Sequence, residues 1–313
     1  MNDLVFCGTP TFAVPTLEKL AATGFRIKLV VTQPDRPKGR GLELVASPVK
    51  ESALNLALPI TQPEKIKTNA EFRAQLEALK PDAIIVVGYG RLIPQWMLDL
   101  PRLGNINLHA SLLPKYRGAA PIQWAIARGE IVTGVTTMRL DAGLDTGDIL
   151  LRREMPIAVD DTAETLSPRL AAIGADLVIE TLRGLNDGSV QRHPQDHSKA
   201  TLAPILKKED GSVDFSLTAR EIFNRIRGFQ PWPGAYTKFR GKNLQIWKAQ
   251  PVETFAKEST AGELRVADDR LLVACGGQSA LELLEIQLEG KKRSTAPDFL
   301  HGYRIAPGEK LGG

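Results

Sequence analysis

The sequence predicts an α/β protein with a doubly wound, mostly parallel sheet, followed by a smaller C-terminal unit built as an OB-like β-barrel. First, short apolar runs alternate with segments of helical spacing through the first half of the chain. Second, the chain turns polar and mixed near Gln191. Third, short strand-like runs separated by glycine-containing turns follow, which is typical of a small barrel or sandwich.

Each element of the first half has a local signal. Apolar runs predict strands over Leu4–Gly8, Arg26–Gln33, Asp82–Gly90 and Gly104–Ala110. Helical spacing predicts helices over Thr11–Ala22, Pro48–Leu56 and Asn69–Leu79. Two β segments joined by a Gly/Asp-rich loop are expected next, and then a helix that begins after Thr162 and ends near Gly184 and Gly188.

The change to a polar, mixed composition near Gln191 sets the expected domain boundaries. We expect an α/β domain over residues 1–189, a linker over 190–206 and the barrel over 207–313. The strand-like runs of the barrel are "AYTKF", "LQIWKA", "LLVAC" and "LELLEIQL".

The composition is that of an ordinary soluble globular protein, with 24% charged and 43% hydrophobic residues among 313. The two cysteines, Cys7 and Cys275, form no CxxC pair, which argues against a zinc cluster or a disulfide framework and suits a reducing compartment. The N-terminus lacks the features of a signal peptide, and no apolar run is long enough to span a bilayer. We therefore expect a cytoplasmic protein.

Asn107 and His109 are the leading candidates for chemistry. They lie two apart on a predicted strand, so their side chains leave the same face. At the carboxyl end of a parallel strand, that face opens onto the crevice where α/β proteins bind ligands. An amide and an imidazole side by side can polarise a carbonyl, stabilise an oxyanion and transfer protons. A histidine on its own is more often a hydrogen-bonded core residue, and that alternative stays open at this point.

The downstream run "LDAGLDTGDIL" carries three aspartates among glycines. A carboxylate of this loop can orient the histidine or hold a water that carries protons; the alternative is a solvated turn. Gly143 and Gly147 permit the tight chain path that such a placement needs. The chain has no GxSxG, GxGxxG or P-loop motif. The chemistry indicated is direct attack of a substrate nucleophile on a carbonyl, without a covalent enzyme intermediate.

These segments together resemble a known family. The run "NINLHASLLPKYRGAAPIQ" followed by "GLDTGDI" is similar to the signature of the folate-dependent formyltransferases. The resemblance extends over essentially the whole chain, and it narrows to the methionyl-tRNA formyltransferases through the segments "FCGTPTFAVPTLEKL", "VVTQPDRPKGRG", "PDAIIVVGYGRLIP", "GFQPWPGAYT" and "GKKRSTAPDFLHGYRIAPGEKLG".

The resemblance implies a Rossmann-like formyltransferase domain and a reaction. In this family, 10-formyltetrahydrofolate donates its formyl group to the α-amine of methionine on initiator tRNA, which gives N-formylmethionyl-tRNA for translation initiation. By this resemblance Asn107, His109 and Asp145 are catalytic. Asn107 and His109 would stabilise the tetrahedral intermediate, and Asp145 would orient His109 and a water. Asp141 and Asp148 are then expected to be structural.

The resemblance also implies binding residues. The expected folate-binding residues are Ser111, Leu112, Leu113 and Pro114 of "SLLP", with Arg91, Leu92 and Ile93 of "GRLIP". No metal and no nicotinamide are implied. The expected tRNA-binding residues are Arg36, Lys38 and Arg40 in the long connection over 33–47, with Lys207 and Lys208.

Local charge supports a polyanionic partner. From Lys207 to Lys248 nine Lys and Arg residues stand against four Asp and Glu, an excess of +5 against +4 for the whole chain. A charge run is usually only a solvated face. We expect a monomer that binds neither DNA nor a membrane.

The sequence is also compatible with two other functions. The first is a formyltransferase for a sugar nucleotide or another small amine, which shares the catalytic strand but needs no basic loop or barrel. The second is a non-catalytic tRNA-binding module on a related fold. Intact Asn107, His109 and Asp145 argue against the second.

Overall fold

The structure is a computed structural model that describes residues 2–38, 43–252 and 259–312. Its contacts divide the chain into two compact units. The first unit comprises Met1–Gly118, Val132–Pro156 and Ser167–Ala203. The second comprises Ala119–Ile131, Ile157–Leu166 and Pro204–Gly313. Segments from both halves of the sequence therefore contribute to the second unit. The functional boundaries at residues 189 and 207 stay a prediction.

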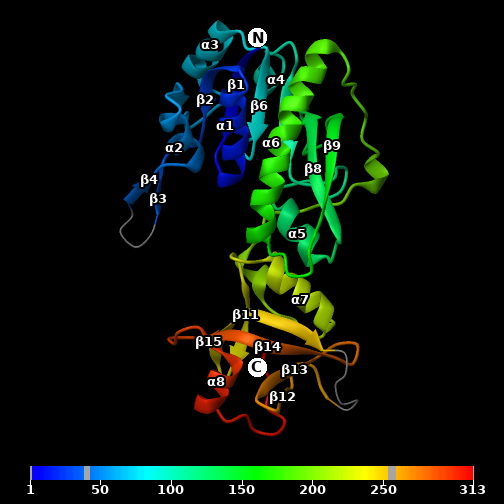
Figure 1. Ribbon diagram of the computed structural model, residues 1–313. Coiled ribbons are helices and arrows are strands. Elements are labelled where there is room, and N and C mark those ends of the chain that lie inside the picture. The colour runs from blue at the N-terminus through cyan, green and yellow to red at the C-terminus, as the bar shows by residue number, and fades with distance from the viewer. Residues whose placement is uncertain (1, 39–42, 253–258, 313) are drawn as a thin grey trace. The chain divides into compact units, whose positions relative to one another are not determined.

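A seven-stranded sheet forms the centre of the first unit (Figure 1), with the strand order β5-β2-β1-β6-β7-β8-β9. The strands are β1 (Asp3–Gly8), β2 (Arg26–Val31), β5 (Ile60–Thr61), β6 (Ala83–Val87), β7 (Asn105–His109), β8 (Val132–Arg139) and β9 (Ile149–Pro156). The first five strands of this order run parallel, whereas β8 is antiparallel to both β7 and β9. The predicted doubly wound, mostly parallel fold is confirmed.

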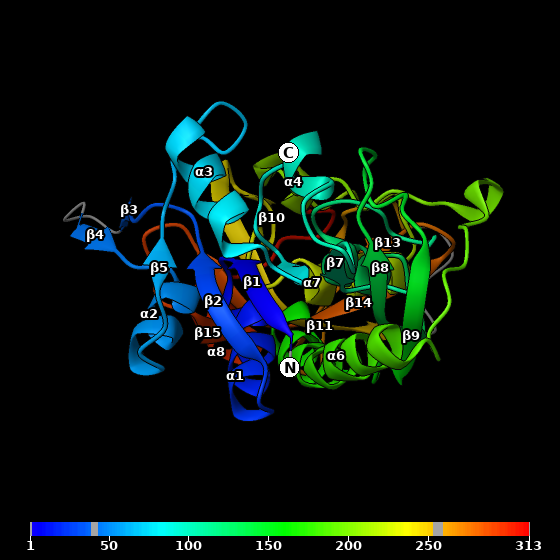
Figure 2. The same cartoon turned by 90° about the horizontal axis from the view of Figure 1, so that it is seen from above.

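Helices cover both faces of this sheet. They are α1 (Val14–Ala22), which follows the 3-10 turn η1 (Thr11–Ala13), α2 (Pro48–Asn55), α3 (Ala70–Leu79), α4 (Gln95–Leu98) and α6 (Ala163–Asp187). Figure 2 shows α1 and α6 on one side of the strands and α3 and α4 on the other. The helix expected from Thr11 begins as a 3-10 turn and becomes an α-helix only at Val14, without a side-chain cap. The predicted starts of α2 and α3 are accurate to within one residue, and a polar cap stabilises each. The Ser47 hydroxyl accepts from Lys50 N at 3.1 Å, and the Asn69 side chain accepts from Phe72 N at 3.0 Å.

The alternating pleat of the strands fills two hydrophobic layers. Val5, Cys7, Ile84 and Val86 pack with α3 and α4 in one buried cluster. On the other face, a Cβ on Gly174 of α6 would lie 2.7 Å from a methyl of Leu108 on β7, so glycine lets the helix approach this strand. Cys7 is a free thiol buried in the core, as expected, and burial raises its pKa.

The 33–47 connection contains two short strands that pair antiparallel, β3 (Arg36–Lys38) and β4 (Glu43–Val45). The sequence predicted a long connection here and no strands within it. Residues 39–42 lie outside the described residues, and Arg40 is among them.

The second unit contains an antiparallel sheet with the order β10-β11-β14-β13-β12, and β15 pairs with β14. Its strands are β10 (Ala235–Phe239), β11 (Lys242–Val252), β12 (Leu264–Ala267), β13 (Arg270–Cys275), β14 (Ser279–Leu288) and β15 (Ser294–Thr295). They contain the four runs read from the sequence, which confirms the expected antiparallel β unit.

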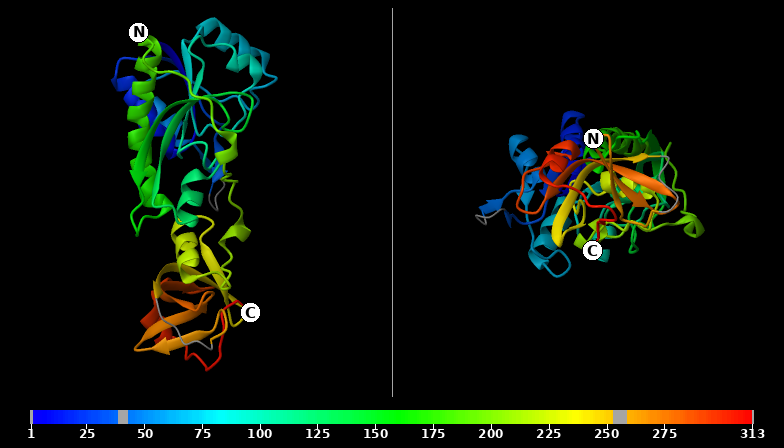
Figure 3. Two further views of the ribbon diagram at one scale, coloured as in Figure 1. Left: turned by 90° about the vertical axis from the view of Figure 1, so that its right-hand side faces the viewer. Right: turned by 90° about the horizontal axis from the view of Figure 1, so that it is seen from below.

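Among the described residues, the helices α5 (Pro121–Ala127), α7 (Ala219–Gly228) and α8 (Ala296–Gly302) lie wholly within this second unit (Figure 3). Thr218 and Glu221 form a capping box at the start of α7. Ile222 and Ile226 of this helix enter the core of the sheet. Within the described parts of the chain, no helix is both long and apolar enough to cross a bilayer.

Candidate active site

Asn107 and His109 lie at the carboxyl end of β7, and these residues are 8% and 6% exposed. Strand β7 pairs in parallel with β6 through Val86 and Asn107, and in antiparallel with β8 through His109 and Thr136. Pairing on both sides fixes the strand, and its pleat sends both side chains to one face. The structure therefore brings the amide and the imidazole together, as the spacing predicts.

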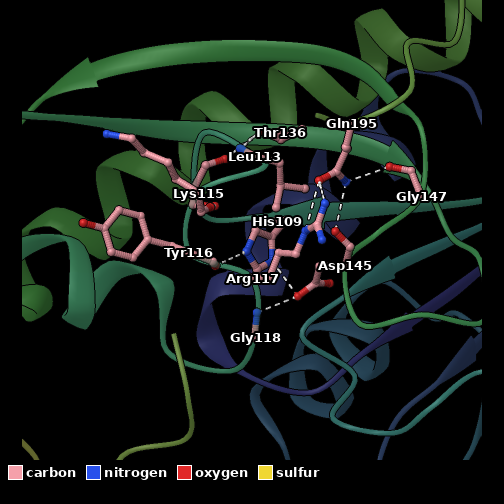
Figure 4. A network of polar contacts seen from close by, with 11 residues as sticks. His109, Leu113, Lys115, Tyr116, Arg117, Gly118, Thr136, Asp145, Gly147 and Gln195 are labelled. Carbon is pink, nitrogen blue, oxygen red and sulfur yellow. Dashed lines mark hydrogen bonds and ion pairs between the residues drawn. The ribbon is translucent and has the colours of Figure 1, made fainter. Parts of the chain in front are cut away.

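The His109 ring is held from two sides (Figure 4). Its Nε2 lies 2.8 Å from the carbonyl oxygen of Tyr116, and its Nδ1 lies 3.6 Å from Oδ2 of Asp145. Because a carbonyl only accepts, Nε2 carries the proton in the neutral ring, and Nδ1 holds the free lone pair. The distance of 3.6 Å exceeds a direct hydrogen bond and is compatible with a bridging water.

Asp145 is placed by its own unusual backbone. Its φ angle is +51°, in the left-handed region that asparagine and aspartate tolerate better than most residues. Its Oδ2 accepts a hydrogen bond from Gly118 N at 2.8 Å. The carboxylate is thus fixed between the loop after β8 and the segment after β7.

The loop that carries Asp145 needs its glycines. A Cβ on Gly147 would lie 1.8 Å from the carbonyl oxygen of Arg139, and one on Gly143 would lie 1.9 Å from Oγ1 of Thr146. Asp141 accepts from Gly143 N and from the Thr146 hydroxyl, so its carboxylate serves the turn itself.

Two asparagines of β7 have contrasting environments. The Asn105 amide donates to the carbonyl oxygens of Met97 and Leu98, at 2.9 and 3.1 Å, and anchors α4. No hydrogen bond to the Asn107 side chain is found among the described residues. Its amide is therefore available to a ligand, as an oxyanion donor must be.

The segment Ser111–Pro114 borders the pair, but two of its side chains serve the fold. The Ser111 hydroxyl is buried and donates to the Lys115 carbonyl at 2.6 Å, and Leu113 packs with Met138 and Ile149. Leu112 and Pro114 are partly exposed. A ligand here can be contacted by these two side chains and by the main chain.

The second expected folate segment follows β6. Leu92 is 80% exposed, whereas Ile93 packs against the α3–α4 core. The Arg91 guanidinium donates to the carbonyl of Glu64. Gly90 is in the left-handed conformation at φ +76°, and a Cβ there would lie 2.8 Å from Gln33. Leu92 is therefore the residue of this segment that is available for an apolar ligand surface.

The expected tRNA-binding residues lie in different parts of the chain. Arg36 is an exposed residue of β3, and Lys38 ends that strand. Lys207 and Lys208 are exposed at the start of the 3-10 turn η3 (Lys208–Gly211). One cation of the basic 207–248 segment does not belong to a solvent face. Arg227 is 9% exposed, and its Nη1 donates to the carbonyl oxygens of Ala158 and Asp161.

The sequence analysis missed Gln195, a residue of the expected linker. The stretch up to Ala203 is hydrogen-bonded to the first unit: His193 exchanges two main-chain hydrogen bonds with Ile149, and Arg117 N donates to the Thr201 carbonyl. Gln195 itself contacts Arg117 and the Asp145 loop. A single glutamine in a polar stretch carries no periodic signal, so only the structure reveals it.

Among the described residues, no group of three or more His, Cys, Asp or Glu side chains is arranged to hold a metal ion. What the site offers is a free amide, a histidine with one free nitrogen and a carboxylate beside it.

The fold is that of a formyl-transferring enzyme, and comparison with known proteins agrees. The formyl transferase family profile matches residues 1–182, and that of the formyl transferase C-terminal domain matches residues 205–304. The chain therefore belongs to the formyl transferase family, which confirms the resemblance seen in the sequence.

Relatives in the family are similar over their full length. The methionyl-tRNA formyltransferase of Koribacter versatilis is 66% identical, with 99% of this chain and 98% of that one covered. That of Acidobacterium capsulatum is 62% identical, with 99% of each covered. An N-formyltransferase from Helicobacter canadensis, solved with folinic acid and dTDP-3-aminofucose, has the same fold. Its TM-score is 0.66 at 18% identity, with 90% of this chain and 99% of that one covered.

Proposed function

We propose that this protein transfers the formyl group of 10-formyltetrahydrofolate to the α-amine of methionine on initiator tRNA. The observation that carries the proposal is the unbonded Asn107 amide beside the His109–Asp145 pair, in a chain whose full-length relatives are methionyl-tRNA formyltransferases. The small-amine alternative is supported by the fold likeness alone.

The proposed step is direct attack of the amine nitrogen on the formyl carbon. The new C–N bond forms as the carbonyl electrons move to oxygen, and the Asn107 amide donates to that oxygen. His109 accepts a proton from the attacking amine at Nδ1, and Asp145 stabilises the resulting imidazolium across 3.6 Å. The bond from the formyl carbon to the folate nitrogen then breaks, and the leaving nitrogen takes the proton.

The chain's residues fit a folate donor. Leu92, Leu112 and Pro114 offer apolar side chains that are at least partly exposed, and the main chain around them offers hydrogen bonds. Ser111 and Leu113 would shape this segment, because both side chains are buried and Thr136 bonds the Ser111 carbonyl and the Leu113 amide. Folate bound by these residues would supply the formyl group as a substrate.

We further propose that the tRNA is bound by Arg36, Lys38, Arg40, Lys207 and Lys208. The exposure of Arg36, Lys207 and Lys208 supports this assignment, and guanidinium groups suit phosphates and base edges. The expected monomer and cytoplasmic setting remain predictions.

The roles of Asn107 and His109 are tested by His109→Ala and Asn107→Ala. Each is expected to lower kcat by about 100-fold or more, since an oxyanion donor typically supplies ~2.7–4 kcal/mol of barrier reduction. The affinity for methionyl-tRNA, measured by filter binding, is expected to stay near that of the wild type. A loss under about tenfold in kcat would contradict the assigned roles.

A further inference from the structure

Gln195 is buried, 6% exposed, and uses its whole carboxamide (Figure 4). Its Nε2 donates to the carbonyl oxygens of Asp145 and Gly147, at 2.9 and 2.7 Å. Its Oε1 accepts from Nε and Nη2 of Arg117, at 3.1 and 2.6 Å. Both donors and both acceptor positions of the amide are therefore occupied.

The two hydrogen bonds that Gln195 donates go to the Asp145 loop, whose backbone is strained at Asp145. Asp145 has a left-handed backbone, a conformation that is strained for a residue with a side chain and persists where its surroundings hold it. Gln195 holds the carbonyl of Asp145, while Gly118 N holds its carboxylate. Asp145 is thus fixed at its main chain and at its side chain.

The hydrogen bonds that Gln195 accepts come from Arg117, which belongs to the segment that contacts His109. Arg117 lies between Tyr116, whose carbonyl oxygen bonds His109, and Gly118, whose amide bonds Asp145. Main-chain bonds with Thr201 and Ala203 fix Arg117 further. Gln195 therefore connects the two segments whose separation sets the distance from His109 to Asp145.

We propose that Gln195 is a positioning residue for formyl transfer, which sets the Asp145 loop so that the carboxylate faces Nδ1 of His109. This inference rests on the proposed function. Gln195 makes no hydrogen bond to His109 among the described residues, and it acts through the main chain of Asp145 and Gly147.

The second unit offers a matched control. Oδ1 of Asn224 accepts from Nε and Nη2 of Arg227, at 3.1 and 2.9 Å, and both residues are buried. This carboxamide–guanidinium pair resembles that of Gln195 and Arg117 in chemistry and burial. It has no bond to the Asp145 loop.

The test compares Gln195→Glu with Asn224→Asp in the full-length protein. Each change keeps an oxygen acceptor for its arginine, but only Gln195→Glu removes the donors to the carbonyls of Asp145 and Gly147. Formyl transfer to methionyl-tRNA gives kcat and KM. Amide hydrogen exchange of Gly118, followed by NMR, reports the position of the Asp145 carboxylate without any substrate.

For Gln195→Glu we expect kcat to fall about 10- to 100-fold, as misplacement of a catalytic group by an ångström does, with KM for both substrates nearly unchanged. The Gly118 amide is expected to exchange faster. Asn224→Asp is expected to leave both readouts near wild type. If Gln195→Glu does not fold, Gln195→Asn tests the same contacts, because the shorter side chain cannot reach both carbonyls.

A kcat for Gln195→Glu within about threefold of wild type, or an unchanged exchange rate of Gly118, would overturn the proposal. An equal loss of kcat in Asn224→Asp would also overturn it, since the effect would then be general to buried pairs. Absence of formyl transfer by the wild-type protein would instead refute the proposed function, and the exchange of Gly118 would still decide whether Gln195 positions Asp145.

Discussion

The most informative single substitution is Asp145→Asn, because it changes charge and little else. Asparagine tolerates the left-handed backbone at φ +51°, and its side-chain oxygen can still accept from Gly118 N. The change removes the negative charge that lies 3.6 Å from Nδ1 of His109. Any loss of activity then reports the electrostatic role of the carboxylate.

The size of the effect follows from Coulomb's law. Two unit charges at 3.6 Å interact by about 4.6 kcal/mol at an effective dielectric of ~20, and by about 1.2 kcal/mol at ~80. At ~1.4 kcal/mol per tenfold, these limits correspond to losses of about 10³-fold and about sevenfold in kcat. Both side chains are largely buried, at 7% and 14% exposure, so we expect a loss near the upper limit.

The assay is single-turnover formyl transfer at saturating donor and methionyl-tRNA, with thermal unfolding measured in parallel. We expect a loss of rate near the upper limit of about 10³-fold and a stability close to wild type. Asp145→Ala serves as the comparison, since it adds roughly 1–3 kcal/mol of left-handed strain to the same loss of charge. A rate for Asp145→Asn within about threefold of wild type would refute the electrostatic argument.

Two further predictions concern the loop and the second unit. Gly147→Ala places a Cβ against the Arg139 carbonyl, so we expect destabilisation of ~1–3 kcal/mol in denaturant unfolding and a large loss of activity; unchanged stability would contradict the close contact. Arg270, which bonds Glu282 at 2.6 Å, lowers the pKa of that carboxyl. Its ionised form therefore contributes stability that is present above the unfolded-state pKa and is lost as pH falls through the folded-state pKa. Glu282→Gln is expected to destabilise the protein at pH 7 and to reduce its loss of stability on acidification; an acid-unfolding curve parallel to that of wild type would contradict this.

The strands and helices were predictable because their signals are local. The five residues of β6 are all buried, and an uninterrupted apolar run is what such a strand requires. The helical spacing of apolar residues located α2 and α3, and the structure adds that Ser47 and Asn69 cap them through hydrogen bonds within three residues. The shared face of Asn107 and His109 follows from the period of a strand.

The remaining features depend on contacts between distant residues. Gln195 bonds atoms 48 to 78 residues away, and nothing in its neighbourhood distinguishes it from a linker residue. Arg227 counts as a surface charge by composition, yet its guanidinium is enclosed by main-chain carbonyls and Asn224. The burial of the Ser111 and Leu113 side chains likewise depends on Thr136 and Met138 of β8. Sequence patterns reveal the period of apolar residues and the residues that begin or end an element. They do not reveal hydrogen bonds or packing between residues that are distant in the sequence.

The most direct test of the central claim is formyl transfer from 10-formyltetrahydrofolate to three acceptors side by side: methionyl initiator tRNA, methionyl elongator tRNA and glycinamide ribonucleotide. The proposed function predicts transfer to the initiator alone. The same assay with Arg40→Ala is expected to reduce the preference for the initiator. Transfer to the small amine alone would keep the chemistry of Asn107, His109 and Asp145 but contradict the proposed substrate and the roles of the basic residues.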